Sequence, residues 1–309
     1  MSDILDFSKL ALHRRDLAKT ISVLESDAAA DKAIADDIVR QAFDHVQNHY
    51  SGRVIAVTGM PGAGKSTFID VFGLHLAQQG HKVAVLAVDP SSQLTFGAIM
   101  GDKTRMLDLG RHPNAYIRPS PSGAGYLGGV SAKTEDVVLL LKAVGFDYIF
   151  IETIGVGQNE SDVSLFADQV IMLVPPATGD EIQALKRGNI EFIDLILINK
   201  HDGDTRASAE AAASSYRSSL GANAKIILIS SLEKTGLDAV ALSLQAMPCR
   251  LKNERSLMRY RLERSLLSEL LDVPEVCAIY DESLGVNVPT RDKMRIFMNN
   301  LKKLLTKAC

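Results

Sequence analysis

The 309-residue sequence has no tryptophan, only three cysteines and no long apolar run. Cys249, Cys277 and Cys309 are far apart in the sequence and form neither a C-x-x-C pair nor a cluster with histidine. This spacing argues against a disulfide framework and against a structural zinc site. No apolar stretch reaches the ~18 residues that a membrane-spanning helix needs, so a transmembrane protein is not expected.

The chain also lacks a large excess of either positive or negative charge. The chain has 34 Lys and Arg residues against 37 Asp and Glu residues, a net charge of −3, and no long basic run. A nucleic-acid-binding surface is therefore not expected. The first residues lack the charged-then-apolar order of a secretory signal, and Asp3, Asp6 and Asp16 are unusual for a transit peptide. These features predict a cytoplasmic protein.

What the sequence does contain is a phosphate-binding loop, G-x-x-x-x-G-K-S. It reads Gly59-Met60-Pro61-Gly62-Ala63-Gly64-Lys65-Ser66 and continues with Thr67. The β-branched run before it predicts a strand, and apolar residues at helical spacing from Thr67 to Gln79 predict a helix. Glycines let successive N–H groups turn inward, and the helix adds its positive N-terminal end. We expect this loop to cradle phosphates, with Lys65 reaching the β- and γ-phosphates and Ser66 ligating Mg²⁺.

A second motif, Asn199-Lys200-His201-Asp202, reads N-K-x-D and predicts that the base is guanine. The Asp202 carboxylate can accept hydrogen bonds from the N1–H and N2–H₂ groups of guanine, donors that adenine lacks in that arrangement. A buried carboxylate that faced adenine would stay unpaired, which costs a few kcal/mol. Ser230-Ser231-Leu232 follows a later apolar run and is expected to place backbone N–H groups against guanine O6.

Short apolar runs along the chain predict an α/β fold with a doubly wound, mainly parallel P-loop NTPase sheet, because stretches long enough for crossover helices separate most of them. The runs are Val54–Thr58, Val83–Val88, Tyr148–Ile151, Val170–Val174, Leu195–Ile198 and Ile226–Ile229. Ligands bind at the carboxyl ends of such strands. Asp89, Glu152 and Asn199 each directly follow one of these runs, so they are expected at the ligand site.

Helical extensions are expected on both sides of this domain. Residues 1–50 carry apolar side chains at helical spacing and predict an N-terminal helical cap. Residues 51–248 form the predicted GTPase domain, and residues 249–309 form a C-terminal helical extension. The amphipathic stretch Arg250–Leu271 indicates a buried face without indicating its partner. The extension is therefore either a dimerisation arm or a packed cap.

Acidic residues near strand ends complete the predicted catalytic set. Glu152 is expected to hold Mg²⁺ directly or through water, and Gly155 to contact the γ-phosphate and move when it leaves. Asp89 and Asp102 are candidates for binding Mg²⁺ or positioning water, with helix capping or a turn as the alternative. The catalytic set is Lys65, Asp89, Asp102, Glu152 and Gln158.

The attacking water lacks its usual partner in this sequence. Val156 stands where small signalling GTPases carry the glutamine that orients this water, and Gln158 is the candidate substitute. We therefore expect slow intrinsic hydrolysis that a partner or dimerisation accelerates.

Five phrases together resemble the MeaB/ArgK/MMAA family of P-loop GTPases, over most of residues 5–245. The phosphate loop and N-K-x-D motif are shared by many GTPases, whereas three phrases are far more particular. These three are Val88-Asp89-Pro90-Ser91-Ser92, Gly101-Asp102-Lys103-Thr104-Arg105-Met106 and Glu152-Thr153-Ile154-Gly155-Val156-Gly157-Gln158. The chain departs from the family pattern at Phe96, in the loop Ser120–Gly129 and in the tail from Arg250.

The resemblance implies a GTP-dependent, Mg²⁺-dependent chaperone for an adenosylcobalamin-dependent acyl-CoA mutase, with methylmalonyl-CoA mutase as the first candidate. Such proteins couple GTP hydrolysis to cofactor loading and protect the mutase. The resemblance also implies a homodimer and a further switch segment at Pro175–Gly188. A eukaryotic homologue would be expected in the mitochondrial matrix.

Two other functions compete with this one. A metal-insertion GTPase of a related family would usually carry a His-rich or Cys-rich metal motif, and the sequence has neither. A kinase or ATPase linked to basic amino-acid transport, an assignment attached to the ArgK name, would use ATP, whereas Asp202 favours guanine. The chain also lacks a D-x-H-x-x-G cobalamin-binding motif, as expected of a chaperone rather than a mutase.

Overall fold

The chain divides into two compact units, Met1–Lys252 and Asn253–Cys309. The computed structural model describes residues 5–26, 28–89, 106–121, 132–153, 167–176, 192–221, 224–248, 274–285, 296 and 299–301. The second unit contains the helix α12, Pro274–Gly285. Among the described residues, no helix combines the length and the apolar character needed to cross a membrane. The three-part division at residues 50 and 248 stays a prediction.

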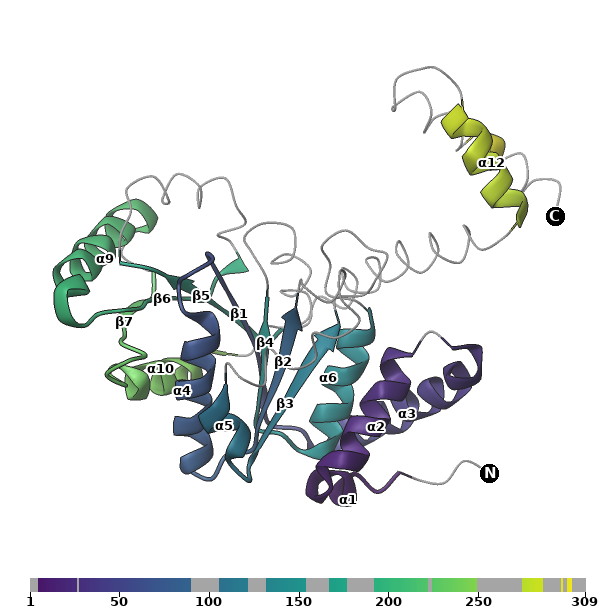
Figure 1. Ribbon diagram of the computed structural model, residues 1–309, viewed down its shortest axis with the longest axis horizontal. Helices are drawn as coiled ribbons and strands as arrows, with labels where there is room; N and C mark the ends of the chain where they lie inside the picture. Colours follow the sequence, from purple (N-terminus) through teal and green to yellow (C-terminus); the bar gives the residue numbers. More distant parts are fainter. Residues whose placement is uncertain are drawn as a thin grey trace. The chain divides into compact units, whose positions relative to one another are not determined.

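A parallel sheet forms the centre of the first unit (Figure 1). Its seven strands run in the order β3-β2-β4-β1-β5-β6-β7, and every neighbouring pair is parallel. The strands are β1 (Arg53–Gly59), β2 (Val83–Asp89), β3 (Ala115–Pro121), β4 (Tyr148–Glu152), β5 (Gln169–Val174), β6 (Leu195–Ile198) and β7 (Ile226–Leu228). The predicted doubly wound α/β fold is confirmed, and Asp89 and Glu152 are the last residues of their strands rather than the residues after them.

Both faces of the sheet are covered by helices, because successive side chains of a strand point to opposite faces. In β1, Val54 and Ala56 pack toward α6 (Ala132–Val144) and the N-terminal helices, whereas Ile55 and Val57 pack toward α4 (Lys65–Gln78). The N-terminal helices are α1 (Phe7–Leu12), α2 (Arg14–Glu25) and α3 (Ala29–His49); α5 (Leu107–Arg111) and α10 (Leu237–Ala246) lie on the α4 side, and α9 (Arg206–Leu220) covers β6 and β7.

The strand β3 was missed by the sequence analysis. Its sequence contains Arg118, Pro119 and Pro121, and proline is normally a signal against a strand because it cannot donate a backbone hydrogen bond. Among the described strands, β3 pairs with β2 alone, at the edge of the sheet, where proline is tolerated. The tertiary position of this segment, and not its composition, decides that it is a strand.

A carboxylate on α4 holds the short helix α5. The N–H of Leu109 donates to Asp70 Oδ1 at 2.8 Å, while Met106, the N-cap of α5, contributes no side-chain cap. The helices also touch closely, since a Cβ on Gly73 would come within 2.7 Å of Leu109 Cδ2. Partial burial raises the pKa of Asp70 above its ordinary value of 3.8. Asp70 therefore caps α5 from a neighbouring helix at an electrostatic penalty.

Substitution of Asp70 separates these two effects. Asp70→Ala removes the acceptor for the Leu109 N–H and should lower the free energy of unfolding by about 1 kcal/mol, whereas Asp70→Asn keeps an acceptor. The pKa of Asp70 is raised in the folded protein, so the folded state binds more protons than the unfolded state. The wild type therefore loses stability relative to Asp70→Asn as the pH rises from 3.8 through the raised pKa of Asp70. Urea denaturation across this range measures both effects. Parallel pH profiles for wild type and Asp70→Asn would show that the carboxylate carries no such penalty.

Candidate nucleotide site

The turn from β1 into α4 has the backbone shape of an anion cradle. Gly62 and Gly64 adopt φ angles of +80° and +89°, which L side chains rarely adopt, and Gly64 is the N-cap of α4. The carbonyl of Met60 accepts a hydrogen bond from Ala63 at 3.2 Å. Within the described part of the chain, no atom accepts a hydrogen bond from the N–H of Gly62, Gly64 or Ser66. These donors and the positive end of α4 suit a phosphate.

Lys65 and Ser66 begin α4 at the carboxyl edge of the sheet. The Lys65 ammonium donates to the carbonyl oxygens of Gly59, at 2.7 Å, and Met60, at 3.2 Å, which keeps it against the loop. The Ser66 hydroxyl donates to Glu152 Oε1 at 2.6 Å. Glu152 ends β4, and its register partner in β1 is Val57. Neighbouring parallel strands thus bring together a hydroxyl and a carboxylate that are 86 positions apart in the sequence.

Asn199 connects the phosphate loop to the segment after β7. Its side-chain amide donates to the carbonyl of Ala63 at 2.9 Å, and its Oδ1 accepts from the Ser231 N–H at 3.1 Å and the Ser231 hydroxyl at 3.0 Å. The residue is buried. A Cβ on Gly64 would approach Asn199 Nδ2 to 2.7 Å, so the loop passes close to this amide. Three segments are therefore held in one arrangement.

The carboxylate of Asp202 is oriented by a neighbouring serine. The hydroxyl of Ser230 donates to Asp202 Oδ2, and the same hydroxyl oxygen accepts from the Glu233 N–H at 2.9 Å. Lys200 is exposed with φ of +62°, and Leu232 is 81% exposed. Lys200 lies two residues before Asp202, and Leu232 directly follows Ser231.

Thr205 supports the same turn and was missed by the sequence analysis. Its hydroxyl lies 2.5 Å from the carbonyl oxygen of Lys200 and 2.9 Å from that of Asp202. A threonine three residues after an aspartate, just before a helix, is a common signal for a hydroxyl that closes a turn onto the backbone. That signal was present in the sequence.

The remaining predicted residues divide into placed and undescribed ones. Pro61 and Thr67 are exposed, and Ala63 is buried against the site. Asp89 ends β2, the strand next to β4, but its side chain is outside the described part, as are Asp102, Gly155 and Gln158. The segment Pro175–Gly188 is described only at residues 175 and 176. The functional roles assigned to all these residues stay predictions.

Comparisons with known proteins place the chain in a family. A protein of Caulobacter vibrioides is 47% identical over 220 residues, which are 71% of this chain and 65% of that protein. The GTPase ArgK of Escherichia coli is 41% identical over 235 residues, 74% of this chain and 70% of that protein. A crystal structure described as LAO/AO transport system kinase superposes with a TM-score of 0.70 at 29% identity and covers 96% of each chain.

A family model described as Methylmalonyl Co-A mutase-associated GTPase MeaB matches residues 17–269. The chain spans slightly less than two thirds of the length of the Caulobacter relative. Most of the chain lies within the family match. With the sheet order and the joined phosphate and N-K-x-D segments already described, the match is conclusive: the chain belongs to the MeaB family.

Proposed function

We propose that this protein binds and hydrolyses GTP with Mg²⁺, and that this cycle assists cofactor loading and protection of an adenosylcobalamin-dependent acyl-CoA mutase. The observation that carries the nucleotide part is the Asn199 side chain, which bonds to the phosphate loop at Ala63 and to Ser231. A single rigid link between the phosphate loop and the N-K-x-D motif sets the spacing that one bound nucleotide must match.

Phosphates are bound by backbone donors before any side chain is needed. The N–H groups of Gly62, Gly64 and Ser66 belong to the loop and to the positive end of α4 that follows it. Lys65 adds a full positive charge beside them, and it exchanges its carbonyl acceptors for the β- and γ-phosphate oxygens when nucleotide enters.

The residues at the loop fit a magnesium ion. Mg²⁺ prefers oxygen ligands and usually takes one or two from the protein, with water and phosphate supplying the rest. Ser66 Oγ and Glu152 Oε1 lie 2.6 Å apart, and both are oxygen atoms of the kind that ligates Mg²⁺. Ser66 and Glu152 would hold the ion, with Asp89 and Asp102 as further candidates. When bound, the ion neutralises charge on the phosphates.

Guanine is selected by Asp202. Its carboxylate is positioned by the Ser230 hydroxyl and accepts from guanine N1–H and N2–H₂. Within Ser230–Leu232, the Ser230 N–H donates to the carbonyl oxygen of Thr235 and the Ser231 N–H to Asn199 Oδ1, so the Leu232 N–H is the donor proposed for O6. Adenine offers no matching donors, so ATP would leave the carboxylate without its two hydrogen bonds from the base.

Hydrolysis by the isolated chain is slow in this proposal. Gln158 orients the attacking water in place of the glutamine that small signalling GTPases carry at the position of Val156. Gly155 responds to loss of the γ-phosphate. A homodimer formed through residues 249–309, or a mutase partner, completes the site and accelerates turnover.

The mutase is proposed as the client because the family description names a methylmalonyl Co-A mutase-associated GTPase. Of the alternatives, a metal-insertion GTPase has no observation in its favour. The kinase alternative has the name of one structural neighbour, a transport system kinase, but the Escherichia coli relative is named GTPase ArgK. The Asp202 environment also favours GTP over ATP.

The test is a nucleotide hydrolysis assay on the purified full-length protein. GTP turnover is measured with Mg²⁺, with EDTA, and with methylmalonyl-CoA mutase added, and ATP is the control substrate. The proposal expects slow, Mg²⁺-dependent, GTP-selective turnover that rises with the mutase. GTP turnover indifferent to the mutase would remove the client while keeping the GTPase, and phosphate transfer from ATP to an acceptor would overturn the proposal.

A further inference from the structure

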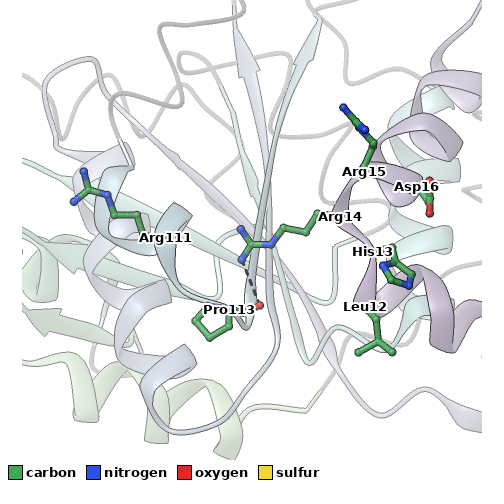
Figure 2. Close-up of a pocket in the computed structure, with 7 residues that line it drawn as sticks. All are labelled: Leu12, His13, Arg14, Arg15, Asp16, Arg111 and Pro113. Atoms are coloured by element: carbon green, nitrogen blue, oxygen red, sulfur yellow. Dashed lines mark hydrogen bonds between the residues drawn. The ribbon is translucent and has the colours of Figure 1, made fainter.

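A hollow of about 710 Å³ with a mostly basic lining lies between the N-terminal helices and the end of α5 (Figure 2). Its lining residues come from the α1–α2 junction, from the last residue of α5 and from the segment that follows α5. They are Leu12, His13, Arg14, Arg15, Asp16, Arg111 and Pro113. This concentration of arginine contrasts with the net charge of −3 of the whole chain.

Arg14 crosses the hollow and has a structural role. Its guanidinium donates to the carbonyl oxygens of Gly110 at 3.3 Å, His112 at 2.5 Å and Pro113 at 3.3 Å, which caps the end of α5. These acceptors are neutral, so they bind the guanidinium without cancelling its charge. A helix C-terminus offsets that charge only in part.

Three side chains of the lining are exposed and make no hydrogen bond or ion pair with any described residue: those of His13, Arg15 and Arg111. The lining contains one acid, Asp16. Its Oδ1 lies 3.8 Å from Lys19 Nζ, so the two side chains form an ion pair. In the view of Figure 2, the Arg14 guanidinium lies between the side chains of Arg111 on α5 and Arg15 on α2. The lining therefore carries three guanidinium groups, and no carboxylate of a described residue forms an ion pair with any of them.

One large, exposed apolar side chain lines the same hollow. Leu12 is 78% exposed, the second highest exposure among the large apolar side chains described. Single exposed leucines are common, but arginine is enriched in protein-binding surfaces, where it supplies much of the binding energy, and an exposed leucine in the same lining adds an apolar contact.

This surface lies away from the proposed nucleotide site. Pro113 precedes β3 and so lies at the amino ends of the parallel strands, whereas the phosphate loop follows the carboxyl end of β1. Occupancy of the hollow is therefore sterically independent of nucleotide.

We propose that this hollow docks an extended acidic segment of a protein partner, with carboxylates on Arg15, Arg111 and Arg14 and an apolar residue on Leu12. Three separated guanidinium groups suit carboxylates spaced along a chain, and guanidinium binds carboxylate through paired N–H donors. The exposed Leu12 in the same lining favours a peptide over a nucleic acid, because an apolar side chain gives a phosphate backbone no partner.

The test uses a fluorescein-labelled peptide of glutamates with one central leucine, titrated by fluorescence anisotropy against the full-length protein without nucleotide. Arg15→Glu/Arg111→Glu should weaken binding about tenfold, because two exposed ion pairs are lost. The matched control is Arg217→Glu/Lys225→Glu, which changes net charge equally at two other exposed positions, one on α9 and one directly before β7. It should bind like the wild type. Leu12→Asn should weaken binding less than the double charge reversal.

Several results would overturn the proposal. These are absent binding to the wild type, equal binding by the Arg15→Glu/Arg111→Glu variant, or an equal loss in the control. Tighter binding of a DNA oligonucleotide or an anionic phospholipid vesicle to the same arginines would assign the surface to another class of partner. Because nucleotide is absent throughout, the result stands apart from the GTP hydrolysis assay.

Discussion

Gly59→Ala is expected to lower the free energy of unfolding by about 4 kcal/mol, from overpacking combined with an unfavourable backbone conformation. Gly59 has φ of +133°, and a Cβ there would lie 2.1 Å from the carbonyl oxygen of Leu173. Leu173 is its register partner on β5, in the middle of the sheet. Backbone in a parallel sheet cannot move aside without breaking strand pairing, so the clash is not relieved by a rotamer change.

Gly62→Ala is the matched control, because it lies in the same loop. Its φ of +80° disfavours alanine, but a Cβ there meets nothing within 4 Å, so a loss of only ~1 kcal/mol is expected. Urea-induced unfolding without nucleotide, followed by circular dichroism, measures both. Equal losses would mean that backbone conformation, and not the contact with Leu173, sets the requirement for glycine at position 59.

Asp202→Asn is expected to weaken GTP binding about 10³-fold, equivalent to ~4 kcal/mol for two hydrogen bonds to a charged acceptor. The same variant should favour xanthosine triphosphate, because the amide can donate to the carbonyl that replaces the guanine amino group. Asparagine keeps an acceptor for the Ser230 hydroxyl, so the turn itself should persist. Titration calorimetry with both nucleotides gives the two affinities.

Two further variants make this result specific. Asp204→Asn removes a charge two residues away on an exposed side chain and should leave GTP affinity unchanged. Lys65→Ala should weaken guanosine and xanthosine nucleotides alike, since it acts on the phosphates. Unchanged GTP affinity in Asp202→Asn would remove Asp202 from the base site and would reopen the choice between GTP and ATP.

The two nucleotide motifs are readable in the sequence because each is continuous and its backbone shape depends on neighbouring residues. Gly62 and Gly64 supply their positive φ angles locally, and the strand and helix around them follow from short-range apolar patterns. The spacing of the motifs does not predict the hydrogen bond from Asn199 to Ala63 or the one from Ser66 to Glu152. Those contacts depend on which strands are neighbours.

The α/β class, the phosphate loop, the N-K-x-D motif and the family resemblance can all be read from the sequence alone, because they depend on local order and periodicity. The tertiary structure decided that the proline-containing segment Ala115–Pro121 is a strand, since an edge position tolerates missing donors. It also decided that Arg15 and Arg111, 96 positions apart, line one hollow. Long-range contacts of this kind follow from the packing of helices on a sheet, which no local pattern encodes.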